Sequence, residues 1–152
     1  MMDLNDDLGY IFSDALIKAV STVSGILIDV VSEERNDELE EITGVMFISS
    51  IRNLMLFISA KESDIKVISS FMTGTPEAEI TTEEAEDTLC ELANITSSGV
   101  KLRVHDEDRR FSISMPFIIK GKDMMISTKQ RARVLSQVIG NDEISLKLVV
   151  ID

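Results

Sequence analysis

Residues 82–104 carry the pattern that most constrains the fold of this chain. Their apolar side chains recur every three or four positions, which is the spacing of one face of an α-helix. Thr81 or Thr82 can serve as the N-cap, and acidic residues follow in the first turns, where carboxylates meet the positive end of the helix dipole. The segment therefore predicts a long amphipathic helix. Its apolar stripe consists of Leu89, Leu92, Ala93, Thr96 and Val100.

The same helix has a second, polar stripe, which we call the polar row. It consists of Asp87, Glu91, Asn94 and Ser98, at intervals of four, three and four residues. Residues at these intervals are neighbours on a helix surface, so the four side chains are expected to face away from the core together. Asn is a mediocre helix former because its side chain competes for backbone hydrogen bonds. On helix geometry alone, an incidental Asn near the helix end is a sufficient explanation.

The polar row resembles the signature of the CheC/CheX-type chemotaxis phosphatases. In that family an Asp or Ser is followed after three residues by Glu, after two more by Asn, and much later by Pro. The matching residues here are Asp87, Glu91, Asn94 and Pro116. The chain carries one copy of the motif, and in this respect it is most similar to CheX, which also has a single copy. The resemblance implies an α+β fold in which an antiparallel sheet is covered by long helices, with two pseudo-duplicated helix–strand–strand halves.

The resemblance also implies an activity, removal of the phosphoryl group from the aspartyl phosphate of a CheY-like response regulator. An aspartyl phosphate already reacts with water, so a catalyst mainly has to position the attacking water in line. The amide of Asn94 suits this task because it donates and accepts hydrogen bonds without carrying charge. Glu91, about 60° away around the helix axis, is expected to pair with the receiver's active-site Lys. Ser98 is expected to be a further partner-binding residue, and Asp87 is expected to be either another one or a support for the start of the helix.

In the family the Mg²⁺ belongs to the receiver, so the resemblance implies no cofactor or metal of this chain's own. It also implies a homodimer joined through the sheet, whose exposed edge is a natural pairing surface. Family members often have Gly immediately before the motif Asn, where this chain has Ala93. An added methyl can impede close backbone approach. The alternative function is therefore a non-catalytic receiver-binding or dimerisation module of the same fold.

Length and composition are typical of a globular protein, and residues 1–152 are expected to form a single domain. The chain has no membrane-length apolar run and no basic region of a secretory signal, so a cytoplasmic location is expected. The net charge of −12 argues against nucleic acid and anionic membranes as partners. It also argues against long-range steering toward a receiver, whose phosphorylation pocket is acidic. One Cys and one His exclude a His/Cys metal cluster, and Cys90 is expected to pack within the helix.

The remaining patterns predict helices and strands in two similar halves, each with a helix and a strand pair. The first helix, which Gly25 is expected to end, carries Asp14, Lys18 and Ser21 at the spacing of the polar row. The spacing matches but the chemistry does not, so the first half predicts no site. The expected helices are 3–24, 62–72 and 82–104; the expected strands are 42–50, 54–60, 111–115, 117–119, 131–139 and 143–151, with a further short strand in 124–127. Residues 26–31 are expected to form a strand or an extended connection, 32–41 an acidic loop or charged edge, and 105–110 a charged turn.

Overall fold

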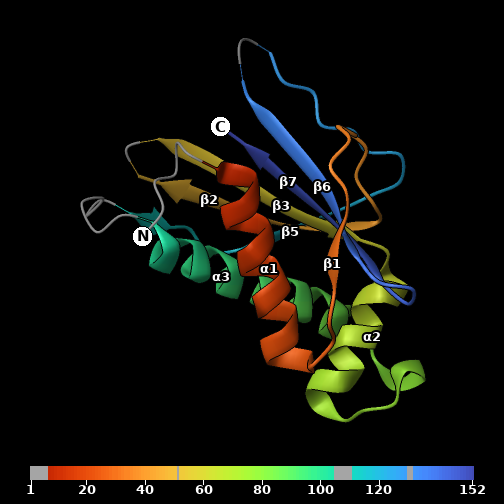
Figure 1. The fold of residues 1–152 in the computed structure, drawn as a ribbon. Helices are drawn as coiled ribbons and strands as arrows, with labels where there is room; N and C mark the ends of the chain where they lie inside the picture. The colour runs from red at the N-terminus through yellow and green to blue at the C-terminus, as the bar shows by residue number, and fades with distance from the viewer. Residues whose placement is uncertain (1–6, 51, 105–110, 130–131) are drawn as a thin grey trace.

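The computed structural model describes residues 7–50, 52–104, 111–129 and 132–152. An antiparallel sheet carries helices on one face, so the predicted α+β fold is confirmed (Figure 1). The helices are α1 (Leu8–Ser24), α2 (Glu62–Thr73), the 3-10 turn η1 (Glu77–Glu79) and α3 (Thr82–Arg103); the strands are β1 (Asp29–Ser32), β2 (Ile42–Ser49), β3 (Asn53–Ala60), β4 (Ser112–Ile113), β5 (Phe117–Lys120), β6 (Val134–Gly140) and β7 (Ser145–Ile151).

The strand order shows how the two halves of the chain are combined. The order is β1-β6-β7-β3-β2-β4, and β5 also pairs with β2. The hairpins β2–β3 and β6–β7 lie at the centre and meet through β3 and β7. Strand β1 of the first half pairs with β6 of the second, while β5 of the second half pairs with β2 of the first. Each half therefore has the predicted helix and strand pair. The first half adds β1, which pairs with β6, and the second half adds β4 and β5, which both pair with β2.

The central strands are buried on both faces, as their nearly continuous apolar sequences predict. One face packs under α1, α2 and α3 and forms the main core. Two loops, residues 33–41 and 121–129, contact the outer face: Ile126 packs against its apolar cluster, and the Lys147 ammonium donates a hydrogen bond to the Glu38 carbonyl. The outer cluster consists of Val45, Phe57 and Val149.

The strand predicted at residues 111–115 is shorter in the structure, where β4 has two residues. Ser114 interrupts the ladder, because its hydroxyl oxygen accepts from the Phe47 N–H at 2.8 Å while its own N–H donates to the Phe47 carbonyl at 2.9 Å. Pro116 then separates β4 from β5, as expected for a residue that has no N–H to donate to a sheet.

Other boundaries agree with the predictions to within a few residues. The strand expected in 124–127 is reduced to an isolated bridge between Met125 and Glu38. Within the part of the chain that the structure describes, no helix is long and apolar enough to cross a membrane. The predicted start of the first helix, part of the 50–53 hairpin turn, the 105–110 turn and the start of the 131–139 strand lie outside the described residues.

Candidate functional site

Helix α3 carries the polar row, and its first turn is fixed by a capping box. The Thr81 hydroxyl accepts a hydrogen bond from the Glu84 N–H at 3.1 Å, and the Glu84 carboxylate accepts one from the Thr81 N–H at 3.0 Å. Thr81 is therefore the N-cap. The last turn contains Lys101 and Arg103, so the charges at both ends of the helix complement its dipole.

The opposite side of α3 packs on the sheet and determines where the polar row points. Leu89 lies so close to β2 that a Cβ added at Gly44 would be 3.2 Å from the Leu89 Cγ. Ser97 donates a hydrogen bond to the sulfur of Met46 at 3.5 Å. The predicted apolar stripe is confirmed, because all of its members are 0 % exposed. These residues are Leu89, Leu92, Ala93, Thr96 and Val100.

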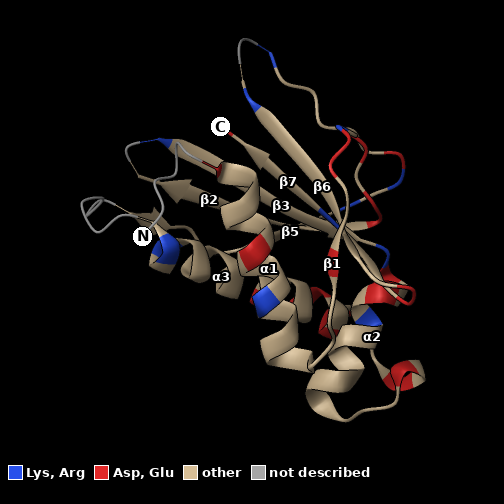
Figure 2. Cartoon of the chain, viewed as in Figure 1, with Lys and Arg blue, Asp and Glu red and all other residues tan. Residues whose placement is uncertain are grey.

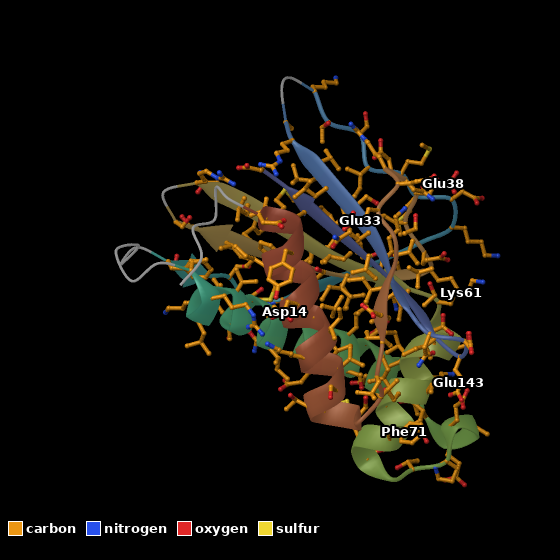
Figure 3. All side chains as sticks on the ribbon, in the orientation of Figure 1. Asp14, Glu33, Glu38, Lys61, Phe71 and Glu143 are labelled. Atoms are coloured by element: carbon orange, nitrogen blue, oxygen red, sulfur yellow. The ribbon has the colours of Figure 1, made fainter. Side chains whose placement is uncertain are left out.

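Helix α1 crosses α3 (Figure 3), and the C-terminal turn of α3 is bonded to it. The Arg103 Nε donates to the Asp14 carboxylate at 2.9 Å, and the Arg103 Nη1 donates to the Gly99 carbonyl at 2.7 Å. Lys18 pairs with the same carboxylate at 3.1 Å. Burial raises the pKa of Asp14, but the hydrogen bonds from Arg103 and Lys18 outweigh it and hold the pKa below its ordinary value. This ion-pair network occupies the position in the first half that corresponds to the polar row.

All four members of the polar row are exposed on the same side of α3. These residues are Asp87, Glu91, Asn94 and Ser98. No side-chain hydrogen bond or ion pair to another described residue occupies them. Asn94 follows Glu91 by three residues, which places it about 4.5 Å further along the helix axis. An amide and a carboxylate thus project side by side from a helix that is held at both ends.

The polar row lies on a ridge, whereas a hollow of about 520 Å³ lies elsewhere on the described surface. Residues of the two outer-face loops line that hollow together with Lys61 and Lys147, and it contains no member of the polar row. A ridge cannot enclose a small substrate in the way that binding clefts do. It can enter the pocket of another molecule.

Two residues adjacent to the polar row are turned toward the protein. Ala93 is 0 % exposed, so its methyl group lies in the core and does not stand between the helix and a partner. Cys90 is half-buried. Burial raises the pKa of its thiol, and the Asp87 and Glu86 carboxylates raise it further, so this thiol is protonated near neutral pH.

Pro116 is half-buried at the sheet edge, between β4 and β5, and is not part of the α3 surface. Pro116 therefore determines the direction of the backbone between β4 and β5 and does not belong to the candidate site. Sequence reasoning did not identify the pair of Arg103 with Asp14. Each of these charges is visible in the sequence, but their pairing depends on the crossing of α1 and α3. Among the described residues, no group of three or more His, Cys, Asp or Glu side chains is arranged to hold a metal ion.

The family model described as "Chemotaxis phosphatase CheX" matches residues 42–139. A CheC-like superfamily protein from Shewanella sp. PV-4 has 21% identity and a TM-score of 0.83, with 97% of each chain covered. The chemotaxis protein CheX from Vibrio vulnificus has 16% identity and a TM-score of 0.82, covering 96% of this chain and 99% of that one.

A chain from the crystal structure of a CheX-CheY-BeF3-Mg²⁺ complex from Borrelia burgdorferi also has this fold. It has 18% identity and a TM-score of 0.77, covering 93% of this chain and 95% of that one. A search of curated protein sequences found no match.

Proposed function

Because the chain belongs to the CheX family of chemotaxis phosphatases, we propose that it hydrolyses the aspartyl phosphate of a CheY-like response regulator. The observation that carries this proposal is the outward projection of Asn94 and Glu91 from a helix whose remaining sides are packed or fastened. A ridge of this kind acts by entering a partner's pocket. The related Borrelia structure is of a complex between CheX and CheY.

In the proposed mechanism Asn94 orients the attacking water. The receiver's aspartyl phosphate supplies the electrophile, so what this chain adds is the position of the nucleophile. The Asn94 side chain can accept a hydrogen bond from the water through its oxygen and donate through its nitrogen, without placing charge beside the phosphoryl group. A side chain on a fixed helix loses little further freedom when it performs this task.

Glu91 is proposed to set the depth and direction of insertion by pairing with the receiver's active-site Lys. A charge-assisted bond of this type is among the stronger hydrogen bonds in proteins. Asp87 and Ser98 lie about one turn on either side of the central pair and would contact the rim of the same pocket. No side-chain rearrangement is proposed within this protein, because none of these four side chains is bonded to another described residue.

The Mg²⁺ in this mechanism is bound by the receiver, where it would neutralise charge on the phosphoryl oxygens. This chain is proposed to need no cofactor of its own. We further propose that residues 1–152 act as a single domain in the cytoplasm, and that two copies form a homodimer through the sheet.

The test is a phosphate-release assay with each CheY-like receiver encoded in the source organism. The receiver is phosphorylated with a small phosphodonor, freed of the donor, and mixed in large molar excess over this protein with Mg²⁺. Wild type is expected to accelerate dephosphorylation with multiple turnovers. Asn94→Ala is expected to lower kcat by about 100-fold or more, because a water without its positioning group loses the in-line geometry.

Ser21→Ala is the matched control, since Ser21 stands in the first-half helix at the position that corresponds to Asn94. It is expected to leave the rate unchanged. Glu91→Ala is expected to raise KM by about 10-fold to 100-fold through loss of its charge-assisted bond. Tight receiver binding with no acceleration by wild type would contradict the proposal and support the non-catalytic receiver-binding module.

A further inference from the structure

Leu102 continues the polar row beyond the residues that the proposed function uses. Asn94, Ser98 and Leu102 follow one another at intervals of four, so they lie on one side of α3. Leu102 is 78% exposed, although it belongs to a helix whose other large aliphatic side chains are buried or half-buried. At 1.5 Å per residue it lies about 12 Å beyond Asn94 along the axis.

Charge is distributed unequally along the same helix. All of its carboxylates precede Asn94, and both of its cations are in the last turn, where Figure 2 shows the basic residues at the C-terminal end. Arg103 is held by Asp14. Lys101 is exposed and forms no ion pair with another described residue. The carboxylates are Glu83, Glu84, Glu86, Asp87 and Glu91.

We propose that Lys101 and Leu102 form a second contact with the phosphorylated receiver and set its orientation along α3. This inference rests on the proposed function, since the receiver is the occupant. The acidic residues around a receiver's phosphorylation pocket are repelled by the glutamates in the first turns of α3, before Asp87, and attracted by Lys101. The body of the receiver therefore extends from Asn94 toward the C-terminal end of the helix, where Leu102 packs against an apolar side chain beside the pocket.

The size of a standard interface supports this assignment. A stable interface covers about 800 Å² on each partner, which corresponds to a disc of about 16 Å radius. A disc centred on Asn94 therefore includes Leu102, at about 12 Å. A partner that receives Asn94 in its pocket would cover Leu102 as well. The arrangement also offsets part of the repulsion caused by the net charge of −12, because Lys101 attracts the receiver at the edge of the contact.

The test compares matched pairs of surface variants in the phosphate-release assay. Leu102→Ser is compared with Leu27→Ser, since Leu27 is 77% exposed but lies after α1, where its carbonyl accepts a hydrogen bond from Asn141. Leu102→Ser is expected to raise KM about tenfold with kcat unchanged, because the lost contact is the same in the ground and transition states. Leu27→Ser is expected to behave as wild type.

The second pair is Lys101→Glu and Lys122→Glu, both at exposed lysines. Lys101→Glu is expected to raise KM at low salt by about tenfold, with the effect shrinking as salt screens it. Lys122→Glu is expected to leave KM near the wild-type value.

The proposed contact at Lys101 and Leu102 can be refuted independently of the proposed phosphatase activity. If wild type dephosphorylates the receiver while Leu102→Ser and Leu27→Ser give the same KM, the orientation is wrong and the phosphatase proposal stands. If wild type does not accelerate dephosphorylation, the phosphatase proposal fails, and binding of receiver activated with beryllofluoride and Mg²⁺ becomes the readout. Weaker binding by Leu102→Ser than by Leu27→Ser then supports this docking surface, and equal binding overturns it.

Discussion

Thr96 provides a quantitative test of how α3 is held on the sheet. Its side chain is 0 % exposed, and its hydroxyl has no hydrogen-bond partner among the described residues. Burying a hydroxyl without a partner costs about 1–3 kcal/mol on the scale of protein mutations. Val has nearly the shape of Thr without the hydroxyl, and its helix propensity is similar. We therefore expect Thr96→Val to raise the free energy of unfolding by about 1–2 kcal/mol.

Thr88 on the same helix is the matched control. It is 6% exposed, and its hydroxyl lies 2.6 Å from the hydroxyl of Ser69, which is 1% exposed. The same substitution at Thr88 removes this hydrogen bond and leaves the Ser69 hydroxyl buried alone. The expected result is a loss of about 1–3 kcal/mol in the free energy of unfolding.

The assay is urea denaturation followed by circular dichroism. With a urea m-value of about 1–3 kcal/mol/M, the two variants are expected to shift the midpoint in opposite directions and to differ by about 1 M or more. Equal m-values for the two variants and wild type are required for this comparison. If Thr96→Val lowers the midpoint as much as Thr88→Val does, the Thr96 hydroxyl is satisfied in the folded protein and the reasoning is refuted.

Three further predictions concern residues around this framework. Ala93→Gly is expected to cost about 1 kcal/mol of stability through helix propensity and to leave kcat unchanged, because the methyl faces the core; a thermal melt and the phosphatase assay check both, and a faster enzyme would contradict the burial argument. Burial raises the pKa of Asp14, but the hydrogen bonds from Arg103 and Lys18 outweigh it and lower the pKa in the folded protein. Wild type is therefore expected to be more stable than Asp14→Asn above about pH 4, and to lose this advantage as the pH falls through the folded pKa. Urea midpoints at about pH 6 and about pH 3 measure this, and a difference independent of pH argues against the network. Gly140→Ala would place a Cβ against the Ile144 carbonyl oxygen, so the β6–β7 hairpin must shift, at a cost of about 1–3 kcal/mol in the free energy of unfolding. A thermal melt is expected to show a Tm lower by about 2–4 °C for each kcal/mol lost. An unchanged Tm would show that the turn accommodates the methyl group without cost.

The local patterns in the sequence predicted the parts of the fold that depend on local physics. The burial of Leu89 and Val100 and the exposure of Asn94 follow from helix periodicity. The sequence predicted a cap at Thr81 or Thr82, and the structure has it at Thr81, whose hydroxyl lies three residues before Glu84 and completes a capping box. Gly25 ends α1 with a φ of 76°, a conformation that glycine adopts without a Cβ clash.

The remaining features depend on contacts between distant segments. No local pattern distinguishes a strand that pairs within its own half from one that crosses to the other, as β1 and β5 do. The outer-face loops join through the Leu39 N–H and the Met124 carbonyl at 2.8 Å, a backbone contact that leaves no signal in side-chain chemistry. For the candidate site, the sequence indicated the polar row but not the fastening of Arg103 to Asp14, because that pair forms only where two helices cross.

The central claim is that the Asn94 amide places the water that attacks the receiver's aspartyl phosphate. It is tested most directly by a single-turnover measurement, in which phosphorylated receiver and Mg²⁺ are mixed with saturating wild type or saturating Asn94→Ala. We expect both proteins to bind activated receiver with the same Kd, while hydrolysis within the wild-type complex is faster by about 100-fold or more. Equal rates of hydrolysis in the two saturated complexes would contradict it.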